Sequence, residues 1–168
     1  KLPNNMKLVI VGAPANTEDY AEYLRVMSIG SDNILFVGEQ SGRKLEALFS
    51  HAALFVQPSE DEGLSLALLE AMAYGLLPIV SNIPANMEAI QDGTGVWFEN
   101  KSVEGLRELL AFYVNRMDEA KAIGEKARAR AEQEYSWDGI ARRTLSTYQE
   151  MLTNEVMIKN NYVTSRLK

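Results

Sequence analysis

Two carboxylates lie on either side of a predicted helix start, in a stretch where few other side chains could do chemistry. Glu62 precedes the unrestricted backbone of Gly63, and seven residues separate Glu62 from Glu70. Within the segment 64–73 the only polar side chains are Ser65 and Glu70. A helix that is apolar on nearly every side is typically buried, and a buried Glu is costly unless it is paired or hydrogen-bonded. The sequence therefore predicts a buried Glu70 with a partner.

Two kinds of partner fit that second carboxylate: a Lys, Arg or backbone donor of the protein, or the hydroxyls of a ligand such as the diol of a ribose. The free N–H groups of Leu64, Ser65 and Leu66, with the positive end of the helix dipole, predict a phosphate site in a chain of net charge −6. Glu62 would then lie close to whatever the phosphate carries. Alternatively, Glu62 is part of a solvated acidic loop, 60–62, or a partner of the helix dipole.

The elements that must position these residues are short apolar strands alternating with helical segments. Nearly continuous apolar strands indicate a parallel sheet with helices on both faces, so we expect a Rossmann-like α/β fold. Ligands of such sheets bind beyond the carboxyl ends of the strands. The predicted strands are 8–11, 34–37, 54–56, 79–80 and 96–98, and the helices between them are 17–29, 41–52, 65–74 and 84–90. Three helical stripes follow residue 100, the last with Ser136 as its N-cap, and the tail from Glu155 is expected to fray.

Composition narrows the class of protein. The chain has 168 residues, of which 46% are hydrophobic and 24% charged, as in a single soluble globular domain. A net charge of −6 argues against a nucleic-acid surface, and no apolar stretch is long enough to span a membrane. No His or further Asp cluster accompanies the acidic loop, so we expect no metal. The arginines 128, 130, 142 and 143 are interspersed with acidic residues and are expected on solvated helix faces.

The segment from Pro58 to Gly75 resembles a known signature. It has the form Pro-Ser-x-x-Glu-Gly-Leu-Ser-Leu-x-Leu-Leu-Glu-Ala-Met-Ala-Tyr-Gly and is followed by Pro-Ile-Val-Ser at 78–81. This pattern is similar to that of family 4 glycosyltransferases, which have the GT-B fold and retain the anomeric configuration of the donor. The resemblance extends to 8–12, 34–38 and 81–88, and in element order it covers about residues 1 to 150.

The resemblance implies a role for each matching residue. Residues 1–153 would be the C-terminal, nucleotide-sugar-binding domain, with 154–168 as a tail. Glu62, the candidate catalytic residue, would contact hydroxyls of the donor sugar, and Glu70 would hold the ribose. The backbone N–H groups of Gly63, Leu64 and Ser65 would bind the sugar and the diphosphate.

Two further positions match the family less closely. Gly12 would lie in a loop near the nucleotide, although Ala13-Pro14 departs from the usual second Gly. Glu88 stands where the family usually has a Glu, and a helix-surface charge is an equally good interpretation of it.

The resemblance also implies a reaction. The parent protein would be a cytoplasmic hexosyltransferase, or one peripheral at the inner face of the membrane. It would transfer a hexose from a UDP- or GDP-linked sugar to a glycan or a lipid-linked acceptor, in polysaccharide or glycoconjugate biosynthesis. The donor is a substrate, and no cofactor, metal, nucleic acid or membrane contact is implied for this domain. The alternative is a non-catalytic nucleotide-binding or scaffolding domain with the same fold.

The family pattern has parts that this sequence does not match. The family's second domain begins with a strand, an Arg and Lys loop that neutralises the donor phosphates, and a helix, and an N-terminal domain binds the acceptor. Without them we expect weak donor binding and no activity of the chain alone. In the strand order 3-2-1-4-5-6 the unmatched strand is central, between 8–11 and 54–56. We expect this gap to be closed by direct pairing of those strands, by a second copy of the chain, or by residues from elsewhere.

Overall fold

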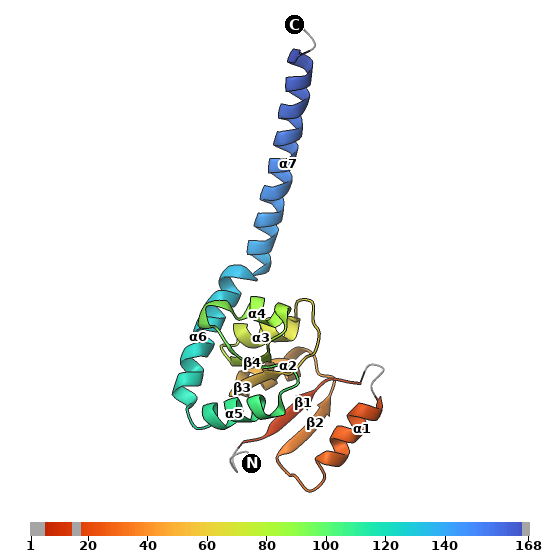
Figure 1. Cartoon of the computed structure of the whole chain (residues 1–168), viewed down its shortest axis with the longest axis vertical. Coiled ribbons are helices and arrows are strands. Elements are labelled where there is room, and N and C mark those ends of the chain that lie inside the picture. The colour runs from red at the N-terminus through yellow and green to blue at the C-terminus, as the bar shows by residue number, and fades with distance from the viewer. Residues whose placement is uncertain (1–5, 15–17, 166–168) are drawn as a thin grey trace.

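Parallel strands alternate with helices through the first part of the chain, and three helices follow (Figure 1). The structure is a computed structural model that describes residues 6–14 and 18–165. The elements in chain order are β1 (Leu8–Val11), α1 (Glu18–Met27), β2 (Ile34–Gly38), α2 (Gly42–His51), β3 (Leu54–Gln57), α3 (Leu66–Ala73), β4 (Leu77–Ser81), α4 (Pro84–Ala89), a 3₁₀ turn (Gln91–Gly93), β5 (Val96–Phe98), α5 (Val103–Tyr113), α6 (Met117–Glu134) and α7 (Trp137–Ser165).

The α/β fold predicted from the sequence is confirmed. All five predicted strands and the four helices between them form where they were expected, and no end differs by more than two residues. The pattern succeeds because apolar β-rich runs and helical stripes agree with the start and stop signals that flank them. The predicted N-cap of the last helix also forms, since Ser136 Oγ accepts from the Gly139 amide at 3.3 Å. Ser65, which was expected as the first residue of its helix, instead caps α3 by accepting from the Leu68 amide at 3.2 Å.

The strands form two separate parallel sheets. β1 pairs with β2, and β4 lies between β3 and β5. In the order 3-2-1-4-5-6, strands 2 and 3 pair on one side of the central strand 1, and strands 4, 5 and 6 pair on the other. With strand 1 unmatched, β1 and β2 correspond to strands 2 and 3, and β3, β4 and β5 correspond to strands 4, 5 and 6. Direct pairing of β1 with β3, one of the three expected ways of closing the gap, does not form within the described residues. Each of these two strands therefore keeps one edge with unpaired backbone groups.

The unit of β1, α1 and β2 has no core of its own. Within 6–14 and 18–40 no residue is buried, and α1 exposes Tyr20, Tyr23 and Met27. No hydrogen bond found in the described residues joins this unit to the rest of the chain. A two-stranded sheet without a buried residue is expected to be marginally stable in water on its own.

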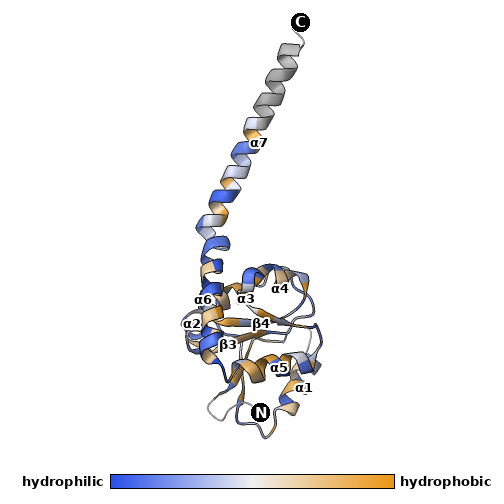
Figure 2. Ribbon diagram, turned by 60° about the vertical axis from the view of Figure 1, so that its left-hand side comes forward, coloured by the Kyte–Doolittle hydropathy of each residue, from blue (hydrophilic) through white to orange (hydrophobic). Residues whose placement is uncertain are grey.

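The core lies around β4, all five residues of which are buried. Because side chains alternate along a strand, Leu77 and Ile79 pack on one face with Phe98 and residues of α5, whereas Val80 packs on the other face. The second face is covered by α3, α4 and the middle of α6, through Leu68, Met72, Ala89, Ile90, Ala127 and Ala131. Hydrophobic colour is concentrated in β3, β4 and the helices around them (Figure 2).

Helix α7 projects from this body as a single long helix (Figure 1). Trp137, Tyr148 and Met151 are exposed along it. The helix continues across residue 153 to Ser165, so most of the segment expected as a separate tail is drawn as part of α7. No helix in the described part of the chain is both long and apolar enough to cross a membrane.

Helices α3 and α6 approach most closely at two glycines. A Cβ placed on Gly124 would lie 2.0 Å from the carbonyl oxygen of Gly75, which follows α3 with φ of 73°. Real side chains do not come that close to a backbone atom, and the backbone cannot rotate away as a flexible side chain could. The absence of a side chain at Gly124 therefore sets how near α6 lies to the end of α3.

The variant Gly124→Ala therefore shows whether overpacking at this contact or the higher helix propensity of alanine has the larger effect on stability. Propensity alone would make the alanine variant more stable by about 0.5–1 kcal/mol, whereas overpacking should make it less stable by about 1–3 kcal/mol. We expect a net loss in the free energy of unfolding, measured by urea denaturation. Ala122→Gly, at an exposed position of the same helix, measures the propensity contribution alone. A gain in stability for Gly124→Ala would contradict the close approach of α3 and α6.

Candidate functional site

The residues singled out in the sequence gather where β3 and β4 end. In the parallel register Gln57 of β3 pairs with Val80, and Ser81 of β4 pairs with Phe98, so the three strands end at the same edge of the sheet. The loop after β3 contains Glu62 and Gly63, and α3 starts directly after it, with Ser65 as its N-cap. This edge is where open parallel sheets bind ligands.

Glu62 is held by one of its two carboxylate oxygens. Oε1 accepts from Ser59 Oγ at 2.8 Å and from Gln57 Nε2 at 3.3 Å. The side chain is exposed, and no hydrogen bond to Oε2 forms within the described residues. Glu60, by contrast, pairs with Lys101 Nζ at 3.0 Å. All three acidic residues of the loop 60–62 are exposed, as the solvated-loop alternative has it, and Glu62 is in addition oriented by two donors while keeping one oxygen available.

The N-terminus of α3 presents unused donors. The amide groups of Gly63, Leu64 and Ser65 donate to no acceptor within the described residues, and all three residues are at least partly exposed. Together with the positive end of the helix dipole, these amides suit an anion such as phosphate.

Glu70 differs from the prediction made for it. The sequence argument expected it to be buried, but it is exposed, and no cation or hydrogen-bond donor of the described residues pairs with its carboxylate. The expectation failed because only one side of α3 is covered. Leu68 and Met72 pack into the core, while the opposite side carries Glu70 between Leu66, 67% exposed, and Tyr74, 41% exposed. The internal ion pair, one of the two partners expected for Glu70, does not form within the described residues, so its carboxylate is available to solvent or a ligand.

Two other predicted positions lie outside this cluster. Gly12 ends β1 in the other sheet, with φ of 131°, and its amide donates to Gly38 O at 2.9 Å. No described hydrogen bond connects it to Glu62 or Glu70. Glu88 is exposed on α4, as the surface-charge interpretation has it.

Four polar residues help to hold the elements of the site in place, a role that the sequence analysis did not predict for them. Gln57, Ser81 and Asn86 are all buried and hydrogen-bonded to the loop or to each other. Arg130 was expected on a solvated face, but its side chain is only 18% exposed and its Nε donates to Ala89 O at the end of α4. A signal existed for Gln57 and Ser81, because each is a polar residue that ends an apolar strand at the ligand-binding edge.

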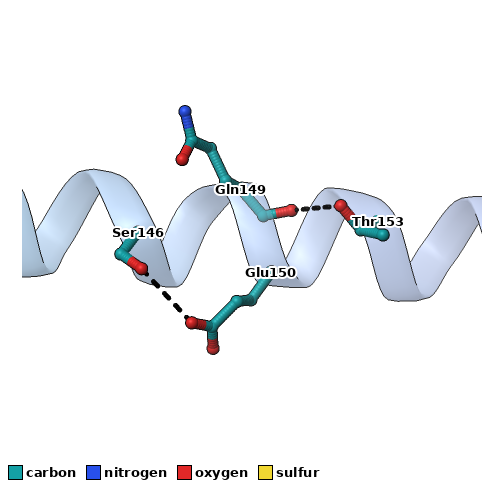
Figure 3. Close-up of a pocket in the computed structure, with 4 residues that line it drawn as sticks. All are labelled: Ser146, Gln149, Glu150 and Thr153. Atoms are coloured by element: carbon teal, nitrogen blue, oxygen red, sulfur yellow. Dashed lines mark hydrogen bonds between the residues drawn. The ribbon is translucent and has the colours of Figure 1, made fainter.

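A pocket lies on α7, away from the site, and no network of buried polar residues supports it. Its lining residues, Ser146, Gln149, Glu150 and Thr153, all belong to that one helix (Figure 3). Their hydrogen bonds are local, from Ser146 Oγ to Glu150 and from Thr153 Oγ to Gln149 O. With no second element converging on it, this surface offers nothing that would orient a ligand. No group of three or more His, Asp or Glu side chains that could hold a metal occurs in the described ranges.

Comparison with known proteins gives a consistent picture. The model of the family "Glycosyl transferases group 1" matches residues 1–130. An uncharacterized glycosyltransferase of Methanocaldococcus jannaschii is 30% identical over 147 residues, which are 87% of this chain and 37% of that protein. The α-maltose-1-phosphate synthase of Mycolicibacterium smegmatis is 29% identical in an alignment of length 160 that covers 89% of this chain and 41% of that protein.

Solved structures share the fold. Anabaena HepE in complex with UDP superposes with a TM-score of 0.80 at 19% identity, over 89% of this chain and 42% of that one. The C-terminal domain of a glycosyl transferase group 1 family protein from Francisella tularensis gives 0.69 at 22% identity, over 78% of this chain and 70% of that one. The chain thus spans about two fifths of the length of the full-length relatives.

The N-cap of α3 gives a test of the site's local structure. Ser65 Oγ accepts from Leu68 N and also donates to Gln57 Oε1 at 2.9 Å, whereas Ser102 Oγ caps α5 through Gly105 N alone. Ser102→Ala should cost about 1 kcal/mol, and Ser65→Ala about 1 kcal/mol more because it also leaves a buried amide oxygen without a donor. Urea denaturation of both variants measures the difference. Equal losses would show that the Ser65–Gln57 bond contributes nothing.

Proposed function

The chain belongs to the glycosyl transferases group 1 family, and from that premise we propose that it is the donor-binding domain of a retaining hexosyltransferase. Its substrate is a nucleoside diphosphate sugar, linked to UDP or GDP. In the parent protein the hexose passes to a glycan or a lipid-linked acceptor, held by a further domain that the relatives' greater length allows for. Cytoplasmic polysaccharide or glycoconjugate biosynthesis is the setting that this chemistry fits.

One observation carries the proposal. Glu70 has no protein partner, and it is on the same helix whose first amides are free to bind an anion. A nucleoside diphosphate has both groups that this arrangement suits, a diphosphate for the helix N-terminus and a ribose diol for the carboxylate. The structures of Anabaena HepE in complex with UDP and with UDP-glucose contain ligands of this class.

The remaining residues take the roles that the family resemblance implies, and their positions are compatible with those roles. Glu62 precedes the free amides of Gly63, Leu64 and Ser65, so its unbonded oxygen would reach hydroxyls of the sugar attached to the diphosphate. In a retaining transfer, the diphosphate leaves from the face on which the acceptor hydroxyl arrives. The α3 N-terminus would stabilise the negative charge that develops on the leaving diphosphate. Gly12 would complete the nucleotide side of the site only when the two sheets are joined in the parent protein.

The chain alone should bind donors weakly and transfer nothing. Charge-assisted hydrogen bonds dominate diphosphate recognition, and no Lys or Arg of the described residues pairs with the loop 62–65. The open edges of β1 and β3 must also be covered for the two sheets to act as one surface. We propose that further chain of the parent protein supplies this cover, or that a second copy does so when the chain is alone.

Replacement of Glu70 tests the assignment. Ligand-observed NMR with UDP, GDP, UDP-glucose and GDP-mannose should show saturation transfer to ribose and base protons for the preferred nucleotide. Glu70→Ala should weaken that nucleotide about 10- to 100-fold, because a hydrogen bond to a charged group contributes about 1.5–3 kcal/mol.

Glu125→Ala is the matched control, since it removes the same charge from an exposed position of α6. Its affinity should equal that of the unchanged chain. Equal affinity for Glu70→Ala would contradict the ribose assignment, and silence from every nucleotide with a folded sample would favour the non-catalytic scaffolding domain.

A further inference from the structure

A buried polar network joins three elements beneath the donor loop. Gln57 at the end of β3 is 7% exposed, Ser81 at the end of β4 is 0% exposed, and Asn86 in α4 is 1% exposed. Asn86 Nδ2 donates to Ser81 O at 3.1 Å and to Ser81 Oγ at 3.2 Å, and its Oδ1 accepts from Gln57 Nε2 at 3.2 Å. Ser81 Oγ in turn donates to Ser59 O in the loop. No buried side-chain polar atom of the described residues is left without a partner.

The hydrogen bonds permit only one orientation of the Gln57 amide. Its Nε2 donates to both Asn86 Oδ1 and Glu62 Oε1, while its Oε1 accepts from Ser65 Oγ. Rotating the amide by half a turn would set its oxygen against two acceptors, one of them a carboxylate. Asn86 fixes that choice because its own Nδ2 is already committed to Ser81 at the end of β4. The orientation of Gln57 therefore depends in part on Asn86, which makes no hydrogen bond to the donor loop within the described residues.

The network ends at one exposed group. Gln57 Nε2 and Ser59 Oγ hold the same oxygen of Glu62, so its other oxygen is presented to solvent from a defined direction. A buried, fully satisfied network is a rigid support, whereas an exposed Glu without it would sample several rotamers. Gln57 also accepts from Ser65 Oγ, but the bond that caps α3 runs from Leu68 N to Ser65 Oγ and does not involve Gln57, so the α3 N-terminus keeps this cap when Gln57 is changed.

We propose that Gln57 and Asn86 are positioning residues that aim Glu62 at the sugar of the donor, so that they determine sugar recognition without affecting nucleotide recognition. This inference rests on the proposed function. It separates the site into two parts: the sugar is read by Glu62 on its network, and the nucleotide is read by Glu70 and the α3 amides. A network that merely fills the core would instead support both parts equally.

The test compares binding of UDP and UDP-glucose, or of GDP and GDP-mannose if guanosine is preferred. Gln57→Met keeps the size of the side chain and removes all of its hydrogen bonds to Glu62, Asn86 and Ser65. The ratio of the two dissociation constants, nucleotide over nucleotide sugar, should fall about 3- to 10-fold, with the affinity for the nucleotide itself unchanged. Ser59→Ala removes the other bond to Glu62 from a less buried place, and should lower the ratio in the same direction.

Thr94→Val is the control for lost stability. Thr94 is 5% exposed, and its hydroxyl donates to Gln91 O, away from the network. This variant should leave the ratio as it is. If Gln57→Met weakens UDP and UDP-glucose by the same factor, or if Thr94→Val lowers the ratio equally, Gln57 has no positioning role and the inference is wrong.

A second readout needs no ligand. Three-bond couplings in the ligand-free chain report the rotamers of Glu62, which should populate one χ1 rotamer in the unchanged chain and in Thr94→Val. Averaging of Glu62 over several χ1 rotamers in Gln57→Met would support the positioning role, even if the unchanged chain binds no nucleotide. Absence of nucleotide binding would count against the proposed function alone. An unchanged rotamer distribution in Gln57→Met would overturn the inference.

Discussion

The hydrogen-bonded ladder of β3, β4 and β5 is the constraint on which the described structure depends. Because the strands are parallel and in register, Gln57, Ser81 and Phe98 come to one edge of the sheet. The loops that follow them then carry the acidic loop, α3 and α4 to the same place. Burial of β4 on both faces keeps this edge fixed, and the Gly75–Gly124 contact fixes α6 behind the end of α3. Glu62 and the free amides of 63–65 are thus presented by a rigid support.

The sheet of β3, β4 and β5 ends at an open edge on β3, and this edge is one of three unusual features of the molecule. β3 has a partner on one side only, and β1 and β2 form a sheet without a buried residue. The side of α3 that carries Leu66 and Glu70 is likewise uncovered in the described residues. A domain that shares its core and its site with further protein would have these properties, and the relatives are more than twice as long as this chain.

Local pattern predicted the elements well because each signal concerns a few adjacent residues. Continuous apolar runs located every strand, and Ser136 caps the helix that was predicted to follow it. Burial was less predictable, since it depends on what covers each face. Glu70 was expected inside because its helix is apolar, yet that side of the helix has no cover in this chain. Arg130 was expected in solvent, yet it reaches the end of α4, 41 residues away in sequence.

The polar support of the site could not be predicted for a related reason. Gln57 and Asn86 are 29 residues apart, and only the parallel register of β3 and β4 brings them together. The residue types were visible in the sequence, but neither belongs to a spacing that indicates a contact. Residues that touch a ligand tend to lie within one local motif, whereas the residues that orient them are distributed over the fold.

Amide chemical-shift mapping is the most direct test of the central claim that this chain carries the donor site on the loop and helix after β3. A nitrogen-15-labelled sample would be titrated with UDP or GDP to millimolar concentration. The account predicts that the largest shifts occur at Gly63, Leu64 and Ser65 and along the Glu70 side of α3. Shifts concentrated on α7 or on the β1–β2 unit, or none at all in a folded sample, would contradict it.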